Sequence, residues 1–355
     1  MNILVVGKYY KEAFAEHISE TLVAMGHHVR RFEAGVPTDA FGRLIGQRMR
    51  QARELVYTAS DNLPAVRAAH MRRFWNAAEA APVDLVISTY DYFWPTEVAE
   101  LKRRTHAQIA LWYPDTCANF NRAYFMNAPY DGLFFKDPYL VHVLGGVLKS
   151  PVYYLPECYN PARHWLPEDQ IGNDPAYSCQ IATAGGLHSY RVAFFTHLAD
   201  YDVKIWGGAS PLWLPLGPVA KMYQGRVVYN QEKVKAFRGA SILLNNLLFA
   251  EIWGVNVRCF EAAGAGAFQV VDWRQGLNQL FEQGKELVTF RGISDLREKI
   301  DYWLPREQER KEIAAAGQRR ACRDHTYALR LDLLMMTMAG ACAGYPFPSI
   351  QARGL

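Results

Sequence analysis

Two charged side chains in residues 256–272 have the types and spacing needed to hold an anion beside a pair of hydroxyl groups. Arg258 and Glu261 are three residues apart, so on a helix they share one face about one turn apart. Arg258 would lie in the first turn, where free backbone N–H groups and the helix dipole favour an anion. A cation there can hold a diphosphate, and the carboxylate can accept two ribose hydroxyls. An ordinary ion pair on a βαβ helix remains the alternative.

The surrounding sequence predicts the elements that would position this pair. Apolar runs at residues 241–247 and 267–271 flank it, which indicates strand, loop, helix and strand. Gly264 and Gly266 remove side chains where the helix must approach a neighbour or end in a left-handed cap. Asn256 opens the predicted helix and is a third candidate for nucleotide binding.

A second candidate anion site follows the predicted strand at residues 179–184. Gly185 and Gly186 form a turn before a helix that begins near Tyr190, and such a turn lets backbone amides approach a phosphate. His188 and Arg191 could add hydrogen bonds or charge. Two glycines also make any tight turn, so this alternative stays open.

Two more residues are candidates for the nucleotide because they follow predicted strands. Trp206 ends the strand at 203–207 and is a candidate edge of a nucleobase pocket. Asp272 follows the strand at 267–271 and either holds the ribose or caps the next helix.

Acidic residues follow buried strands in the first half of the chain. Asp91 comes after the apolar strand at 84–89, and Asp115 after the strand at 109–112. Parallel sheets bind ligands at the carboxyl ends of their strands, and a carboxylate in a partly dry pocket can take the proton of an attacking hydroxyl. Asp115 is the preferred catalytic base and Asp91 the second candidate; capping of a turn or helix is the alternative.

The order of apolar runs predicts an α/β protein with two domains. Residues 2–7 begin a βαβ unit that lacks the G-x-G-x-x-G fingerprint, which disfavours NAD and FAD. A stretch rich in Pro, Asn and Asp at 159–175 is the predicted linker. We therefore expect an N-terminal domain at 1–158, a C-terminal domain at 159–325, a helix at 326–340 and a tail at 341–355.

Composition excludes several classes of function. The 39 Lys and Arg residues against 35 Asp and Glu give a net charge of only +4, too small to indicate nucleic-acid binding. The six cysteines fall singly, without zinc spacing or a disulfide framework, which favours a reducing compartment. The sequence has no signal-peptide layout and no run long enough to span a membrane. We expect a cytoplasmic protein with no metal site.

The sequence also resembles a known family over most of its length. The run G-V-N-V-R-C-F-E-A-A-G-A-G at 254–266 is similar to the nucleotide-sugar site of GT-B glycosyltransferases, in particular those related to the spore-maturation protein CgeB. The runs W-Y-P-D-T at 112–116, Y-L-P-E-C-Y-N-P at 154–161 and D-H-T-Y-A-L-R at 324–330 also fit this group.

The resemblance implies two Rossmann-like domains facing a central cleft, with the last helix crossing back to the first domain. It implies metal-independent sugar transfer from a UDP-, GDP- or dTDP-linked donor, without a further cofactor. The acceptor would be a protein, a polysaccharide or a small metabolite. A nucleotide-sugar 2-epimerase or hydrolase, and a non-catalytic nucleotide- or glycan-binding protein, are alternatives on the same fold.

One departure from the family pattern concerns the sugar. Retaining relatives carry two glutamates eight residues apart, and Glu261 matches the second of them. Trp253 stands where the first would be, and Glu251 lies two residues earlier. A direct transfer of the retaining mechanism to this chain is therefore not implied.

Overall fold

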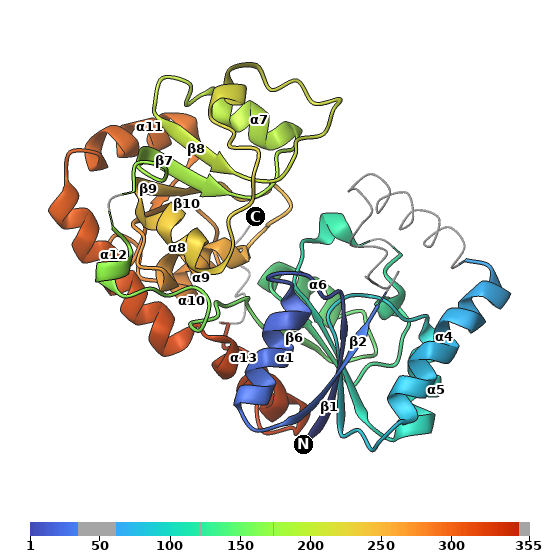
Figure 1. Ribbon diagram of the computed structural model, residues 1–355. Helices are drawn as coiled ribbons and strands as arrows, with labels where there is room; N and C mark the ends of the chain where they lie inside the picture. Colours follow the sequence, from blue (N-terminus) through green and yellow to red (C-terminus); the bar gives the residue numbers. More distant parts are fainter. Residues whose placement is uncertain (35–61, 121, 173, 348–355) are drawn as a thin grey trace.

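The computed structural model describes residues 1–34, 62–120, 122–172 and 174–347. It has two α/β domains, which Figure 1 shows as two lobes, each built on its own sheet. This arrangement confirms the prediction of two Rossmann-like domains.

The N-terminal domain is a six-stranded sheet in the order β2-β1-β3-β4-β5-β6, and every pairing is parallel. Its inner strands are almost wholly apolar, because helices cover both faces of a parallel sheet. The strands are β1 (Asn2–Gly7), β2 (His28–Glu33), β3 (Leu85–Ser88), β4 (Gln108–Tyr113), β5 (Gly132–Phe135) and β6 (Val152–Tyr154). The helices are α1 (Phe14–Ala24), α4 (Pro64–Glu79), α5 (Pro95–Thr105) and α6 (Pro138–Gly145).

The C-terminal domain repeats this design with five parallel strands in the order β11-β10-β9-β7-β8. The strands are β7 (Cys179–Ala184), β8 (Val203–Trp206), β9 (Ala240–Asn245), β10 (Gln269–Asp272) and β11 (Val288–Phe290). The helices are α7 (Ser189–Thr196), α8 (Asn230–Arg238), α9 (Val257–Gly264), α10 (Leu277–Leu280), α11 (Gly292–Trp303) and α12 (Glu307–Asp324).

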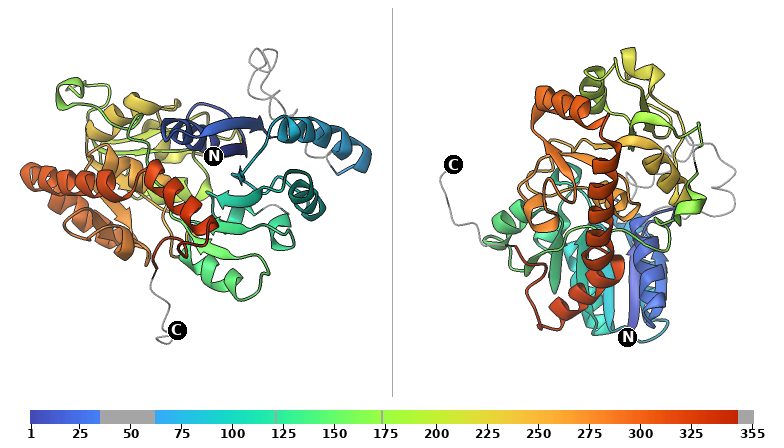
Figure 2. Two further views of the ribbon diagram at one scale, coloured as in Figure 1. Left: turned by 90° about the horizontal axis from the view of Figure 1, so that it is seen from below. Right: turned by 90° about the vertical axis from the view of Figure 1, so that its left-hand side faces the viewer.

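The last helix, α13 (Tyr327–Met338), belongs to the N-terminal domain. Figure 2 shows the chain running down α12 and then along the first domain in α13. Leu331 and Leu334 of this helix are buried with Ile3 and Ile18 in the core on one face of the N-terminal sheet. Apolar side chains thus draw the helix back across the domain boundary, as the sequence predicts. In the described part of the chain, no helix combines the length and apolarity that crossing a membrane requires.

The two sheets point the carboxyl ends of their strands at a shared cavity. The short chain crossings between the domains lie beside each other, because Tyr159 forms a parallel bridge with Thr326. Such a pair of adjacent connections is suited to a hinge.

Candidate functional site

A cavity of about 520 Å³ lies between the two domains. It is lined by the loops that follow β1, β4, β5, β7 and β9, and by the start of α9. Eight of the residues singled out from the sequence line it: Asp115, Gly185, Gly186, His188, Arg191, Asn256, Arg258 and Glu261. Asp91, Trp206 and Asp272 are not part of this lining.

Two arginines lie side by side on the C-terminal wall of the cavity. A Cβ placed on Gly185 would lie 2.8 Å from a guanidinium nitrogen of Arg191 and 2.8 Å from one of Arg258. Gly185 has φ +120°, so both the backbone conformation and the space require glycine here. We call Arg191 and Arg258 the arginine pair.

The arginine pair has polar partners but no direct ion pair in the described residues. Arg191 donates to Gly186 O at 3.0 Å and to Thr183 Oγ1 at 3.1 Å, and Arg258 donates to Asn245 Oδ1 at 2.9 Å. Neither forms an ion pair with a carboxylate among the described residues, and the buried Nε of Arg191 has no hydrogen-bond partner there.

The electrostatics of the pair reflect this arrangement. Burial, and then the neighbouring Arg258, lowers the pKa of Arg191 well below its ordinary value. Burial likewise lowers the pKa of Arg258 to about 10. Two adjacent cations in a protein wall are costly unless an anion joins them. The arrangement is therefore suited to binding an anion.

The position of Arg258 comes from the end of β9. Asn245 and Asn256 exchange two side-chain amide hydrogen bonds of 3.1 and 3.2 Å. The same Asn245 oxygen accepts from Arg258, so the strand end and the N-terminus of α9 hold the guanidinium together. Arg258 thus lies in the first turn of a helix, where the sequence predicted it and where an anion would be favoured.

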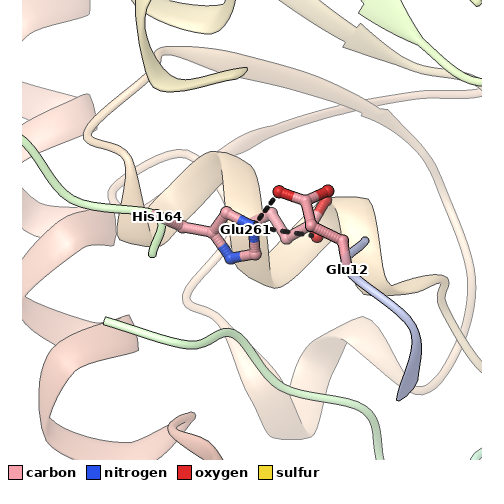
Figure 3. A group of neighbouring side chains, drawn as sticks. All are labelled: Glu12, His164 and Glu261. Carbon is pink, nitrogen blue, oxygen red and sulfur yellow. Dashed lines mark hydrogen bonds and ion pairs between the residues drawn. The ribbon is translucent and has the colours of Figure 1, made fainter. Parts of the chain in front are cut away.

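Glu261 lies one turn along α9 from Arg258 and joins a cluster that bridges the two domains. The Glu12 cluster consists of Glu12 from the loop after β1, His164 from the linker, Lys233 from α8, and Glu261. Lys233 Nζ lies 2.5 Å from Glu12 Oε2 and 2.9 Å from Glu261 Oε1. Figure 3 shows Glu12, His164 and Glu261 converging from three separate segments, with His164 Nε2 at 3.0 Å from Glu12 Oε1.

The Glu12 cluster contains ligand types that hold metal ions, since Glu12, His164 and Glu261 bring their ligand atoms within 4.8 Å of one another. The Lys233 ammonium, however, already lies between the two carboxylates. Burial raises the pKa of Glu12, but hydrogen bonding to His164 and the Lys233 charge outweigh it and lower that pKa to about 2. Burial also opposes ionisation of Glu261, and Lys233 and His164 reverse that effect, so its net pKa shift is downward. We therefore interpret the cluster as a salt-bridge network with Lys233 as its cation.

Glu261 lines the cavity as well as joining this network. Its Oε1 accepts a hydrogen bond from Lys233 Nζ at 2.9 Å. A carboxylate oxygen that faces a cavity beside a cationic wall can accept hydroxyl groups, which is the role predicted for Glu261.

A third charged group lies on the opposite wall. The Lys136 cluster consists of Lys136 after β5, Glu157 after β6, and Glu251 from the loop between β9 and α9. Lys136 Nζ lies 2.7 Å from Glu251 Oε1 and 3.2 Å from Glu157 Oε2. All three side chains are buried and line the cavity. Burial raises the pKa of Glu157 to about 8 in spite of the Lys136 charge.

The two candidate bases occupy different places. Asp115 lines the interdomain cavity and is half-buried, and its carboxylate accepts Thr116 N at 2.8 Å and Asn119 Nδ2 at 2.7 Å. These two bonds cap the turn that follows β4, as the alternative interpretation of Asp115 expects. The same residue also lines the cavity, so both interpretations remain compatible with its position.

Asp91 lies in a neighbouring cavity of about 570 Å³ at the same edge of the N-terminal sheet. Tyr10, Phe14 and Tyr90 line both cavities. Both carboxylate oxygens of Asp91 are buried without a hydrogen-bond partner among described residues, and burial raises its pKa to about 7.

Trp206 and Asp272 have structural partners away from the cavity. Trp206 is buried, with Tyr177 and the Arg226 guanidinium against its ring. Asp272 pairs with Arg274 at 2.9 Å. The Trp206 indole and the Asp272 carboxylate lie outside the cavity lining, although the backbone O of Trp206 accepts Gly185 N–H at 2.8 Å.

Several residues that line the cavity or lie beside it carry no local sequence signal. Glu12, His164, Lys136 and Lys233 come from four different segments and are ordinary surface types when considered singly. Asp115 and Glu261, in contrast, could be found because each follows a strand or lies on an amphipathic helix. Only the fold brings the first group together.

Comparison with known proteins agrees with this architecture. Residues 191–336 match the family described as glycosyl transferase-like. No curated protein matches the chain significantly.

Solved structures match almost the whole chain. Sucrose-phosphate synthase from Thermosynechococcus elongatus has a TM-score of 0.67 at 14% identity, covering 96% of this chain and 100% of its own. Anabaena HepE in complex with UDP-glucose has 0.65 at 13%, with coverages of 96% and 100%. AviGT4, a glycosyltransferase involved in avilamycin A biosynthesis, has 0.58 at 14%, with 96% and 98%. These likenesses establish the GT-B fold.

Proposed function

We propose that this protein transfers a sugar from a nucleoside diphosphate sugar to a hydroxyl-bearing acceptor without using a metal ion. Uracil is the base that we favour, because solved structures of the similar Anabaena HepE hold UDP and UDP-glucose. Within the GT-B glycosyltransferases, the run at 254–266 supports placing the chain with the CgeB-related group.

The arginine pair is the observation that carries this proposal. Two guanidiniums beside a glycine turn, with no carboxylate paired to either in the described residues, provide a site for a diphosphate. Arg191 and Arg258 would neutralise the leaving diphosphate, which is the role that a metal ion has in other transferases. The backbone of Gly185 and Gly186 and the side chain of His188 complete the anion side of the site.

The remaining groups fit the rest of a nucleotide sugar. The Glu261 carboxylate accepts ribose hydroxyls, and Asn256 holds the helix N-terminus in place. In the reaction, the acceptor oxygen forms a bond to the anomeric carbon while the bond from that carbon to the diphosphate oxygen breaks. The diphosphate leaves with the electron pair, and the acceptor proton passes to a base, for which Asp115 is the first candidate and Asp91 the second.

Calorimetric titration with UDP, GDP and dTDP tests this proposal. We expect one of the three to bind wild type, and saturation at 100 times the dissociation constant to raise the free energy of unfolding by about 2.7 kcal/mol. Arg258→Ala should weaken that binding at least tenfold, because it removes a cation from a partly desolvated site. Arg297→Ala on α11 is the matched control. It breaks an exposed ion pair with Asp200 and should bind the nucleotide like wild type.

Failure of all three nucleotides to bind would overturn the proposal. Equal binding by wild type and Arg258→Ala would remove the arginine pair from the site. If a donor sugar is consumed at the same rate with and without any acceptor, the protein is a hydrolase or epimerase rather than a transferase.

A further inference from the structure

We infer that the Lys136 cluster is a subsite that binds the donor's sugar through its hydroxyl groups and excludes sugars that carry a carboxylate. This inference rests on the proposed function, and it adds the class of sugar. The subsite is shared between the domains, because Lys136 and Glu157 come from the first domain and Glu251 from the second.

Glu251 has an unmet hydrogen-bonding capacity at the cavity. Only 4% of its side chain is exposed, and Lys136 holds its Oε1 at 2.7 Å. Its Oε2 is buried and has no partner among the described residues. A buried carboxylate oxygen left without a donor is unfavourable, so a hydroxyl from a ligand would be a favourable partner.

Other unpartnered polar atoms belong to the same cavity. Thr116 Oγ1 from the first domain and Asn246 Oδ1 from the second are both buried without a partner in the part of the chain that the structure describes. One carboxylate oxygen, one amide oxygen and one hydroxyl group therefore face a shared space from both domains. A sugar ring, with hydroxyls on several carbons, can supply both donors and acceptors to such a set.

The charged groups that line the cavity match the chemical groups of the proposed donor. The Glu261 and Glu251 carboxylates both act electrostatically on Arg258, and they oppose the effect of burial on its pKa. Glu261 of the Glu12 cluster and Glu251 of the Lys136 cluster line the same cavity as this guanidinium. A nucleoside diphosphate sugar likewise has an anion between two groups rich in hydroxyls, the ribose and the transferred sugar. With Glu261 facing the ribose, the Lys136 cluster faces the sugar.

The backbone explains why Glu251, and not position 253, reaches this place. The Asp137 carboxylate accepts the backbone N–H groups of Ile252 and Trp253 at 2.8 and 3.1 Å. Gly254 packs so closely that a Cβ there would lie 2.7 Å from Lys136 O. The Trp253 ring packs on Tyr139 instead of lining the cavity.

The selectivity follows from the charges. Two carboxyl groups share the single ammonium of Lys136, so a carboxylate on the sugar would be a third acidic group beside one cation. Burial raises the pKa of Glu157 to about 8, so near neutral pH Glu157 is largely protonated and the ionised Glu251 already balances the Lys136 charge. Like charges in a partly desolvated site repel strongly. UDP-glucose should therefore bind and UDP-glucuronic acid should not.

Three titrations on the intact chain test the inference: UDP, UDP-glucose and UDP-glucuronic acid. For wild type we expect UDP-glucose to bind at least tenfold more tightly than UDP-glucuronic acid and more tightly than UDP. Glu251→Gln should reduce the preference for glucose over glucuronic acid to threefold or less, with UDP binding within twofold of wild type. Glu298→Gln, an exposed carboxylate on α11, is the control and should keep the full preference.

The outcomes separate the two proposals. If UDP does not bind, the proposed function fails and this inference fails with it. If UDP binds but wild type binds UDP-glucuronic acid as well as UDP-glucose, or UDP-glucose no better than UDP, the sugar subsite alone is overturned. Those wild-type results test the sugar subsite even if Glu251→Gln does not fold. An unchanged preference for glucose in a folded Glu251→Gln variant would also contradict the subsite.

Discussion

Asp91 shows how burial can dominate the chemistry of a single residue. Its pKa rises from 3.8 to about 7 because burial of the carboxylate outweighs the opposing effect of the Tyr124 and Phe125 backbone. A carboxyl group poised near neutrality is suited to exchanging a proton with a bound hydroxyl. The cavity that holds it opens beside the proposed donor site, so Asp91 is also placed where an acceptor would lie.

Replacing Asp91 by Asn should change the pH dependence of stability. The folded-state pKa is raised, so the protonated form is favoured on folding and wild type loses stability as pH rises from about 4 to 7. We expect Asp91→Asn to be more stable than wild type at pH 8 by on the order of 2 kcal/mol, and the difference to vanish near pH 4. Urea unfolding at both pH values measures this, with the exposed Asp332→Asn on α13 as control. A difference that does not vary with pH would contradict the assignment.

Single residues were predictable only where a local pattern marks them. Arg258 and Glu261 could be found because their spacing and the flanking strands predict one helix face. Lys136 and Glu251 lie 115 positions apart, and no periodicity connects them. The departure at Trp253 suggested that a sugar-facing glutamate was missing, whereas the backbone bonds of Asp137 turn the loop so that Glu251 lines the cavity.

At the scale of elements, α9 packs closely against the Tyr159 ring, and the glycines at its end predicted such a close approach. Gly266 has φ +74° just beyond the helix end, and a Cβ on Gly264 would lie 2.3 Å from the Tyr159 ring. Tyr159 is fully buried at the crossing between the domains. The last residue of α9 therefore determines how closely the helix that holds Arg258 and Glu261 packs against Tyr159.

Gly264→Ala should destabilise the protein because neither the ring nor the helix has room to move. We expect a loss of about 2 kcal/mol or more, as for other overpacked cores. Gly145→Ala is a matched control, since Gly145 also ends a helix and a Cβ there would meet nothing within 4 Å. Thermal unfolding of both variants tests the comparison; equal stabilities would show that α9 does not rely on this contact.

At the scale of the whole molecule, the order of apolar runs predicted two α/β domains, and the family resemblance implied their Rossmann-like arrangement and the returning helix. Neither could predict how the domains meet. Part of that contact is made by Glu12, which has φ +64° and whose bonds to Asn230 N and His164 tie the loop after β1 to the second domain. These partners are more than 150 residues away in the chain, so only the assembled fold reveals them.

A double-mutant cycle on Glu12 and Lys233 tests whether this contact joins the domains. The pKa of Glu12 falls from 4.5 to about 2 in the folded state, so its contribution is present above pH 4.5 and is lost as pH falls towards 2. We expect Glu12→Gln to lower the free energy of unfolding at pH 7 by about 2 kcal/mol, because it leaves Lys233 with one carboxylate in a buried site. Lys233→Met alone should also destabilise, and the two changes together should cost less than their sum by about 1 kcal/mol or more.

Ligand binding adds a second prediction to the same cycle, because Lys233 also holds Glu261 Oε1 at 2.9 Å. If the Glu12 cluster positions Glu261 for the ribose, Glu12→Gln should weaken UDP binding although Glu12 is on the other domain, and Lys233→Met should weaken it further. Arg163→Met, which breaks the pairs with Glu16 and Glu20 beside the cluster, should destabilise without this loss of binding. Additive stabilities together with unchanged UDP affinity would mean that the domains meet here without influencing the nucleotide.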